Sequence, residues 1–238
     1  MANWNELFYN TENYLKAPET EIYKFIDLLK RNFNTSKLKV WDLGCGAGRH
    51  TVAMAHMGNI VYATDNSEKA ISLTTEWLEK LNLCANIKKS EMNIFPFDNE
   101  TFHGVISWDV LQHNTLEKIK ETINIIWTHL VPGGMLLATI KSDKADLYGQ
   151  GTEIEHNTFV LDTGKEAGVP HHYFDEIELR ELFDQNMWHI KVMAEQIVDN
   201  VEKPDEFWKY TPFRNTTWCV LMQKSNAKQI SFKIKSYR

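Results

Sequence analysis

The sequence predicts an α/β fold in which a doubly wound parallel sheet is followed by an antiparallel strand pair. Apolar, strand-like runs alternate with amphipathic helical segments between about residues 38 and 140, with short connections between them. Repeated strand-helix units of this kind form a parallel sheet with helices on both faces. A glycine-rich turn at residues 44–48 follows the first strand, as in nucleotide-binding α/β folds. Residues 188–198 and 216–223 then indicate two long strands with no helix between them.

Length and composition indicate one globular domain. The chain has 238 residues, of which 43% are apolar, and a net charge of −6. This charge argues against a nucleic-acid partner, because phosphate contacts need clustered lysine and arginine. The cysteines are odd in number and widely spaced, which favours a reducing compartment over disulfides: Cys45, Cys84 and Cys219. With no leader and no apolar run near the ~20 residues of a membrane span, we expect a soluble cytoplasmic protein without a membrane partner. The oligomeric state is left open.

Two helices are expected before the glycine-rich turn, at about residues 4–15 and 19–34, with Pro18 between them. Apolar residues recur at helical spacing in the second helix, so this helix should lie on the sheet. They are Ile22, Phe25, Ile26, Leu29 and Phe33. The first helix carries aromatic residues with a less regular pattern, which indicates core packing.

The stretch VWDLGCGAGRH, residues 40–50, predicts a buried strand, a glycine turn and a helix that begins near Arg49. Glycine tolerates positive φ and has no Cβ, so backbone atoms can approach a ligand closely. The pattern is G-x-G-x-G, and Arg49 stands where the dinucleotide fingerprint G-x-G-x-x-G has its third glycine. The turn is therefore expected to bind a nucleotide-like ligand other than a dinucleotide.

Two acids indicate what kind of ligand the turn takes. Asp42 lies two residues before the first glycine, where it would repel a pyrophosphate but attract an ammonium group. Asp65 ends the second strand, where a carboxylate can accept both hydroxyl groups of a ribose. A nucleoside joined to an amino acid satisfies both acids.

Capping residues predict the boundaries of the helices that follow. Gly58 should end the helix after the glycine turn, and Ser67 should begin the next one. Asn114 and Glu117 have the spacing of a capping box, which would begin a helix over residues 116–130.

Residues 141–174 follow the strand at residues 135–140 and form an insertion that the repeated strand-helix pattern does not explain. Such an insertion lies at the carboxyl end of the sheet, where ligands bind, so we interpret it as a substrate flap. Its tandem His171 and His172 should point to opposite faces, so only one can face the site. No metal site is expected, because the pair lacks metal-ligand spacing. The inward histidine is a substrate contact, a proton acceptor or a structural hydrogen-bonding group.

The motifs resemble those of the class I S-adenosylmethionine-dependent methyltransferases, in order and at the expected spacing. DLGCGAG is similar to the first motif of this family, YATDNS to its ribose-binding segment and EMNIFPF to its adenine loop. FHGVISWDVLQH and LVPGGMLLATI resemble its fourth and fifth strands. The chain departs from the family pattern at Glu91 and His103, where aspartate is common.

The resemblance implies S-adenosylmethionine as the cofactor and S-adenosylhomocysteine as the product. Asp42 would be linked to the amino group, directly or through water, and the turn would contact the methionine part of the cofactor through Gly44, Cys45, Gly46 and Gly48. Asp65 and Asn66 would bind the ribose, Glu91 and Met92 would flank the adenine, and Trp108 would line the passage to the substrate.

The resemblance also implies a Rossmann-like, doubly wound seven-stranded sheet with an antiparallel last strand pair, to which this chain adds an N-terminal helical cap and an insertion after strand five. Residues 1–35 would form the cap, 38–140 the cofactor-binding core and 141–174 the flap. Residues 175–225 would form the last helix and strand pair. The tail, residues 226–238, is either an extra edge strand or a disordered basic segment.

The implied reaction is in-line transfer of the sulfonium methyl group to a small-molecule nucleophile, which needs alignment but no obligatory metal. SWDV after the fourth strand differs from the motifs of enzymes that methylate DNA bases or glutamine. Candidate bases or positioning groups are His113 and one of His171 and His172. The accepting atom is left open among O, N, S and C. A non-catalytic cofactor-binding module and an NAD-dependent oxidoreductase remain as alternatives.

Overall fold

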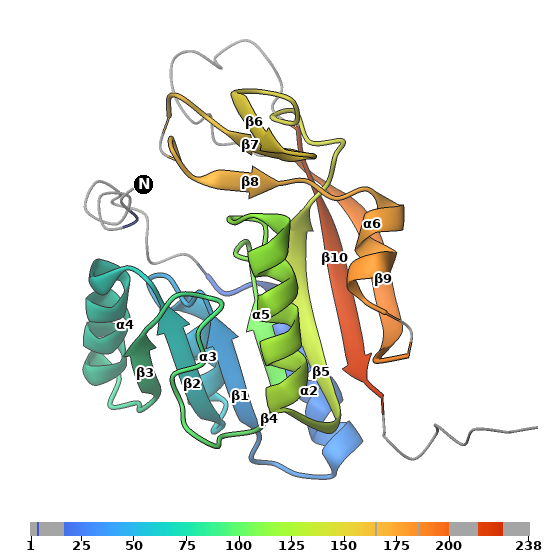
Figure 1. The fold of residues 1–238 in the computed structure, drawn as a ribbon. Coiled ribbons are helices and arrows are strands. Elements are labelled where there is room, and N and C mark those ends of the chain that lie inside the picture. The colour runs from blue at the N-terminus through green and yellow to red at the C-terminus, as the bar shows by residue number, and fades with distance from the viewer. Residues whose placement is uncertain (1–3, 5–16, 165, 185, 200–213, 226–238) are drawn as a thin grey trace, which may run out of the picture.

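A computed structural model describes residue 4 and residues 17–164, 166–184, 186–199 and 214–225. Its main sheet has seven strands in the order β3-β2-β1-β4-β5-β10-β9 (Figure 1). The pairs up to β5 are parallel, and β10 pairs antiparallel with both β5 and β9. The predicted fold class is therefore confirmed. The strands are β1 (Lys39–Leu43), β2 (Ile60–Asp65), β3 (Asn86–Lys89), β4 (Phe102–Ser107), β5 (Leu130–Lys141), β9 (Trp188–Asp199) and β10 (Arg214–Lys224).

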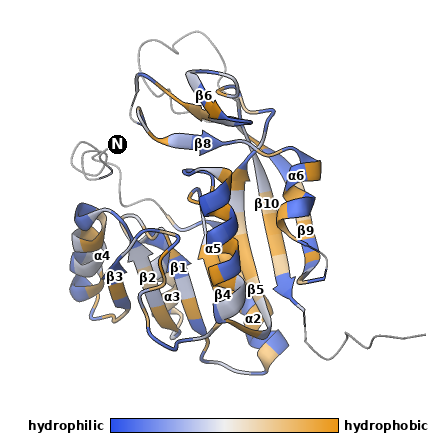
Figure 2. Ribbon diagram, viewed as in Figure 1, coloured by the Kyte–Doolittle hydropathy of each residue, from blue (hydrophilic) through white to orange (hydrophobic). Residues whose placement is uncertain are grey.

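Helices cover both faces of this sheet, with the hydrophobic residues concentrated on the central strands (Figure 2). Alternate residues of β1 face opposite sides: Val40 packs with α2, α3 and α4, whereas Trp41 packs with α5 and α6. All of these β1 side chains except that of Lys39 are buried, as expected for a central parallel strand. The helices are α2 (Thr20–Phe33), α3 (Arg49–His56), α4 (Glu68–Lys80), α5 (Leu116–His129) and α6 (Glu176–Leu182).

The order of the strands places a topological switch point between β1 and β4. From β1 the chain runs outward to β2 and β3, then returns to add β4 on the other side of β1. In doubly wound sheets the connections diverge at such a point, which leaves room for a ligand at the carboxyl ends of the strands. The glycine-rich turn follows β1 and lies at this point.

The insertion forms a small antiparallel sheet of its own, in the order β6-β7-β8, beyond the carboxyl end of β5 (Figure 1). Its strands are β6 (Thr152–Glu155), β7 (Thr158–Val160) and β8 (Pro170–His172). The backbone N–H of His172 donates to the carbonyl of Gln112 at 2.8 Å, and Phe174 N–H donates to the Lys141 carbonyl at 2.9 Å. The insertion is thus attached to the loop after β4 and to the end of β5.

The expected capping box at the start of α5 is wrong. Thr115 is the N-cap and makes no side-chain capping bond, while Asn114 accepts a hydrogen bond from the backbone N–H of Thr115. The acid that meets the helix N-terminus is Glu155 of β6, whose carboxylate accepts from the Leu116 N–H at 2.6 Å. A carboxylate there also interacts favourably with the helix dipole, so α5 and the insertion stabilise each other.

The other predicted caps are confirmed. Gly58 has a φ of +81° just after α3, and Ser67 accepts from the backbone N–H of Ala70 at the start of α4. The first expected helix and the tail at residues 226–238 lie outside the described residues, apart from Trp4. Among the helices that the structure describes, none has the length and apolar character needed to cross a membrane.

Candidate functional site

The glycine-rich turn is fixed to the end of β2 and leaves no space for a side chain at Gly44 or Gly48. The backbone N–H groups of Gly44 and Cys45 both donate to the carbonyl of Thr64, at 2.8 and 2.9 Å. Gly44 has a φ of +75°, and a Cβ there would lie 2.2 Å from a methyl group of Val110. Gly48 has a φ of +92°, and its Cβ would meet the Thr74 side chain at 2.7 Å. The glycines are therefore required by backbone conformation and by packing.

Asp65 connects the turn to the start of α4. Its Oδ2 accepts from the backbone N–H of Gly46 at 2.8 Å, and its Oδ1 accepts from that of Ser67 at 2.9 Å. Burial raises the pKa of this carboxyl group, and the carboxylate of Glu91 raises it further. A backbone hydrogen bond from Asn66 also favours the charged form of Asp65. A carboxylate has about four acceptor sites, so acceptor capacity remains for a ligand hydroxyl.

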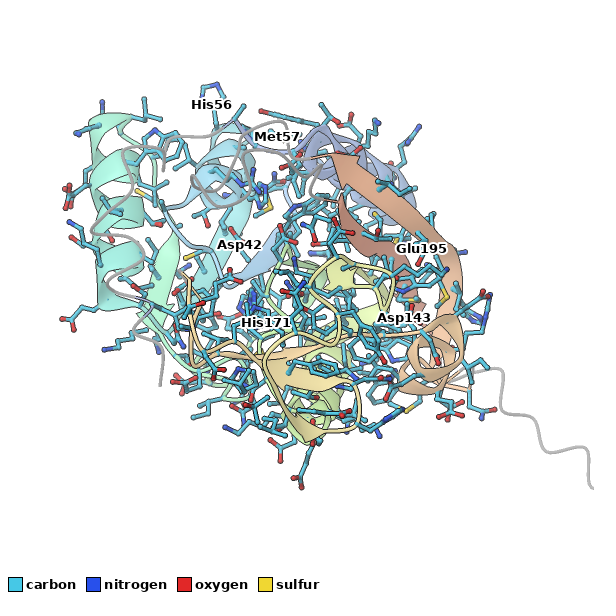
Figure 3. The ribbon with its side chains drawn as sticks, turned by 90° about the horizontal axis from the view of Figure 1, so that it is seen from above. Asp42, His56, Met57, Asp143, His171 and Glu195 are labelled. Carbon is cyan, nitrogen blue, oxygen red and sulfur yellow. The ribbon has the colours of Figure 1, made fainter. Side chains whose placement is uncertain are left out.

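Asp42 lies beneath the turn rather than at its surface. Its side chain is 1% exposed, and its Oδ2 accepts a hydrogen bond from the Thr51 hydroxyl at 2.6 Å. Burial, together with the charge of Asp65, raises its pKa to about 6. Figure 3 views the molecule from above and labels Asp42 on β1 and His171 on β8. The negative charge of Asp42 would act on a ligand from below the turn. The contact would be made by the second carboxylate oxygen of Asp42 or through a water molecule.

The remaining cofactor-site candidates follow the carboxyl ends of three strands in the parallel part of the sheet. Asn66 follows β2, Glu91 and Met92 follow β3, and Trp108 follows β4. Glu91 is exposed, Met92 is buried in the core, and Trp108 is half-buried with its ring 5.9 Å from that of His50. The fold thus brings the predicted residues to one edge of the sheet.

Three buried polar atoms at this edge have no hydrogen-bond partner in the part of the chain that the structure describes. They are His50 Nε2 at the start of α3, Ser107 Oγ at the end of β4 and Gln112 Oε1 in the loop after it. An unpaired buried polar group costs about 1–3 kcal/mol, so such groups mark places where a ligand or water is expected. Sequence analysis did not find these residues, because their burial depends on tertiary packing.

Asp109 is a second feature that sequence analysis missed. It has a φ of +56°, which is unfavourable for a residue with a side chain, and its backbone N–H donates to the Thr139 hydroxyl at 2.8 Å. Its side chain is accessible, yet desolvation by the surrounding protein raises its pKa. Strained residues of this kind concentrate at functional sites. Asp109 therefore belongs with the candidate substrate side of the site.

The insertion brings His171 next to His113, as the predicted flap requires. Their ring centroids lie 4.8 Å apart, and the Trp4 ring lies 5.0 Å from that of His113. Glu166, which sequence analysis missed, contacts both histidines. Its Oε2 lies 2.8 Å from His171 Nε2, and its Oε1 lies 3.9 Å from His113 Nε2. We call His113, Glu166 and His171 the flap cluster.

Burial sets the charges within the flap cluster. It lowers the pKa of His113 to about 3, although the Glu166 carboxylate opposes this shift. Burial alone would raise the pKa of Glu166, but the hydrogen bond to His171 and the neighbouring positive groups lower it to about 2. At neutral pH His113 is therefore a neutral imidazole and Glu166 a carboxylate. His113 is too weak a base to remove a proton efficiently at that pH.

His172 points away from His171, as the alternation of β8 predicts. Its Nδ1 lies 2.6 Å from the Thr158 hydroxyl, and its Nε2 lies 3.1 Å from a carboxylate oxygen of Glu178. Its side chain is completely buried between β7 and α6, so this outward histidine contributes to the packing of the insertion.

Replacing His172 with alanine should destabilise the protein by about 2–4 kcal/mol, since it leaves a cavity and removes two buried hydrogen bonds. Urea unfolding of the full chain measures this change. His156→Ala is the control: His156 is exposed in the same insertion and should change stability by less than about 0.5 kcal/mol. Equal stability of the two variants would contradict the structural role of His172.

Comparisons with known proteins agree with this geometry. Residues 40–134 match the family model described as a methyltransferase domain. A ubiquinone biosynthesis O-methyltransferase from Rickettsia typhi is 29% identical over 127 residues, which are 52% of this chain and 50% of that protein. The probable S-adenosyl-L-methionine-dependent methyltransferase TehB from Haemophilus influenzae is 28% identical over 45% of this chain and 38% of its own. The segment that contains the glycine turn and Asp65 is therefore similar to methyltransferase domains.

Solved structures of methyltransferases share the fold over most of the chain. One from Methanosarcina mazei has a TM-score of 0.70 and 18% identity, covering 89% of this chain and all of its own. Magnesium protoporphyrin IX methyltransferase from Synechocystis, with bound S-adenosylmethionine, has a TM-score of 0.60 and 14% identity, covering 94% of this chain and 90% of its own.

The match to the family model ends before the insertion. The matched residues, 40–134, include the glycine turn, Asp65 and the loop after β4. Glu166 and His171 lie outside that range, and the chain spans about half the length of the curated methyltransferases it matches. The similarity therefore covers the proposed cofactor side of the site, whereas the flap cluster has to be interpreted from its own chemistry.

Proposed function

We propose that this protein binds S-adenosylmethionine at the glycine-rich turn and transfers its methyl group to a small-molecule nucleophile. The observation that carries the proposal is the position of the turn at the switch point, with the Asp65 carboxylate held against it by Gly46 and Ser67. This arrangement offers backbone groups to an amino-acid portion and a carboxylate to ribose hydroxyls.

The predicted cofactor residues would divide the ligand among them. Gly44, Cys45, Gly46 and Gly48 would contact the methionine part through the backbone, above the charge of Asp42. Asp65 and Asn66 would bind the ribose, with Glu91 and Met92 on either side of the adenine. Trp108, which packs against His50, would line the passage from the cofactor to the acceptor.

Methyl transfer requires alignment of the acceptor, the methyl carbon and the sulfur, together with exclusion of water. The sulfonium is already activated, so the protein supplies geometry rather than a covalent residue. The flap cluster stands above the carboxyl end of the sheet and can hold the acceptor. Because His113 is neutral and weakly basic, we assign it a positioning role, and His171, whose ring lies beside it, is the other candidate to contact the acceptor.

A small-molecule acceptor is supported by the acidic net charge of −6 and by relatives whose names state such acceptors. These include the ubiquinone biosynthesis enzyme and the magnesium protoporphyrin IX methyltransferase. We also propose a cytoplasmic location, which the free thiols of Cys45, Cys84 and Cys219 support.

Two measurements separate this proposal from its alternatives. A thermal-shift comparison should show stabilisation by S-adenosylmethionine and S-adenosylhomocysteine but not by NAD, since ligands that bind the native state raise its apparent stability. Release of S-adenosylhomocysteine should then be screened with thiols, amines, phenols and carboxylates. Stabilisation by NAD alone would favour an oxidoreductase. Cofactor binding without turnover on any acceptor class would favour a non-catalytic module.

Cofactor affinity should depend on the ionisation of Asp42. Below its pKa of about 6 this group is neutral and no longer attracts the ammonium group, so affinity should rise as the pH increases from 5 to 7. We expect an increase of about tenfold, equivalent to ~1.4 kcal/mol. By linkage, bound cofactor should lower the pKa of Asp42.

Calorimetry with S-adenosylmethionine between pH 5 and 8 measures this dependence. Asp42→Asn should bind more weakly at pH 7 and lose the dependence, because its side chain does not titrate. A wild-type profile that is flat through pH 6, or one retained in the variant, would separate Asp42 from cofactor binding.

A further inference from the structure

The flap cluster combines two histidines with a glutamate, and positioning the methyl acceptor does not require this combination of side chains. His113 comes from the loop after β4, while Glu166 and His171 come from the insertion. One ligand atom from each residue lies within 4.8 Å of the other two. Two imidazoles and one carboxylate are a common ligand set for zinc and other divalent transition metals.

The hydrogen bond of His171 determines which ring nitrogen is free. Its Nδ1 lies 3.0 Å from the carbonyl of Val169, and a carbonyl can only accept, so we assign the proton to Nδ1. In the neutral ring, Nε2 then directs a lone pair at the Glu166 carboxylate 2.8 Å away. A lone pair facing a carboxylate oxygen is unfavourable, so this contact requires a second proton on the ring or a cation between Nε2 and the carboxylate. Metal-binding histidines commonly donate their other N–H to a backbone carbonyl, as His171 does.

His113 contributes the second ring nitrogen. Its Nε2 is 3.9 Å from Glu166 Oε1, too far for a hydrogen bond, so Glu166 does not occupy the lone pair of this nitrogen. Atoms bound to one ion at about 2.0–2.2 Å lie roughly 3–3.5 Å from each other. The two separations that involve Glu166, 2.8 and 3.9 Å, lie on either side of this range, and all three ligand atoms lie within 4.8 Å of one another, so side-chain movements of about an ångström would bring them to one ion.

Charge and access are also compatible with a cation. The Glu166 side chain is 35% exposed, which leaves a route to solvent, whereas His171 is 3% exposed and held in place. Lys141 is the nearby positive group that acts on Glu166, but its Nζ donates to Asn215 at 2.8 Å. The carboxylate of Asp109 interacts with both Lys141 and Glu166 and offsets the lysine charge.

We propose that His113, Glu166 and His171 bind one divalent transition-metal ion of the zinc class. Sequence analysis predicted no metal site, because it weighed only the tandem histidines and did not find Glu166. Three protein ligands leave at least one coordination position open, as in catalytic rather than structural zinc sites. If the proposed methyl transfer is correct, an oxygen, nitrogen or sulfur atom of the acceptor can occupy that position.

Cobalt(II) alone is the probe for this site, because its visible absorption reports coordination. The full chain is stripped with EDTA, freed of the chelator and titrated with cobalt. We expect one equivalent to bind, with zinc displacing it. Glu166→Gln keeps the side-chain shape at a partly exposed position and should weaken cobalt binding by more than about 100-fold, as should His171→Ala.

The matched control is His156→Ala, which removes an exposed histidine of the same insertion and should leave cobalt binding unchanged. Circular dichroism confirms that each variant is folded. Absence of stoichiometric cobalt binding, or equal affinity of Glu166→Gln and the wild type, would overturn the proposal and leave an ion pair between Glu166 and His171.

Cofactor affinity distinguishes failure of this proposal from failure of the proposed function. None of the three ligands belongs to the proposed cofactor site, so the stripped protein should bind S-adenosylmethionine with unchanged affinity. Cobalt binding without cofactor binding would support the metal site and contradict the methyltransferase proposal. Cofactor binding without cobalt binding would contradict the metal site and leave the methyltransferase proposal intact.

Discussion

Replacing His171 with alanine should reduce turnover by about 10²–10⁴-fold while leaving the affinity for S-adenosylmethionine unchanged. His171 is 2% exposed and is held between the Val169 carbonyl and the Glu166 carboxylate, next to His113. A group fixed in this way contributes through acceptor geometry or proton transfer. Its loss should therefore affect the chemical step and not the binding of the cofactor.

Steady-state kinetics with an identified acceptor, combined with calorimetry of the cofactor, tests this expectation. His156→Ala, in the same insertion but exposed, should keep full turnover. Full turnover of the folded His171→Ala protein would show that the flap cluster is structural. The acceptor site would then have to lie around Asp109, Gln112 and Trp4.

Replacing Asp65 with alanine should weaken S-adenosylmethionine binding by about 2–4 kcal/mol, or roughly 30- to 700-fold. Charge-assisted hydrogen bonds to two ribose hydroxyls contribute ~1.5–3 kcal/mol each and do not simply add. The structure also predicts that this substitution lowers the stability of the protein. Asp65 also accepts from the backbone of Gly46 and Ser67, so the variant should lose stability as well as affinity.

The two effects of Asp65→Ala can be separated by measuring affinity at a temperature where the variant is folded. Asp27→Ala removes an exposed carboxylate on α2 and is the control for net charge. Calorimetry should show weak binding for Asp65→Ala alone. An affinity equal to that of the control would remove Asp65 from the cofactor site.

Local signals in the sequence were sufficient to predict the main sheet and the turn. The spacing of Ile22, Phe25, Ile26 and Leu29 predicted α2, and these side chains are buried against the sheet. The glycine pattern after β1 predicted a turn with positive φ, which the structure has at all three glycines. These features depend on neighbouring residues, so periodicity and backbone chemistry reveal them.

Contacts between distant residues could not be predicted in the same way. Glu155 meets the N-terminus of α5 across 39 positions of sequence, so the local pair Asn114 and Glu117 gave a wrong capping prediction. Glu166 is an ordinary glutamate in the sequence and becomes notable only because the insertion places it against His113 and His171. The burial of His172 likewise follows from the packing of α6.

A crystal structure with bound S-adenosylhomocysteine tests the central claim most directly. The account predicts that both ribose hydroxyl oxygens lie within about 3.2 Å of the Asp65 carboxylate. The amino-acid portion should lie over the glycine turn, with the sulfur directed toward His171. A ligand bound away from the turn, or a ribose without contact to Asp65, would contradict the account.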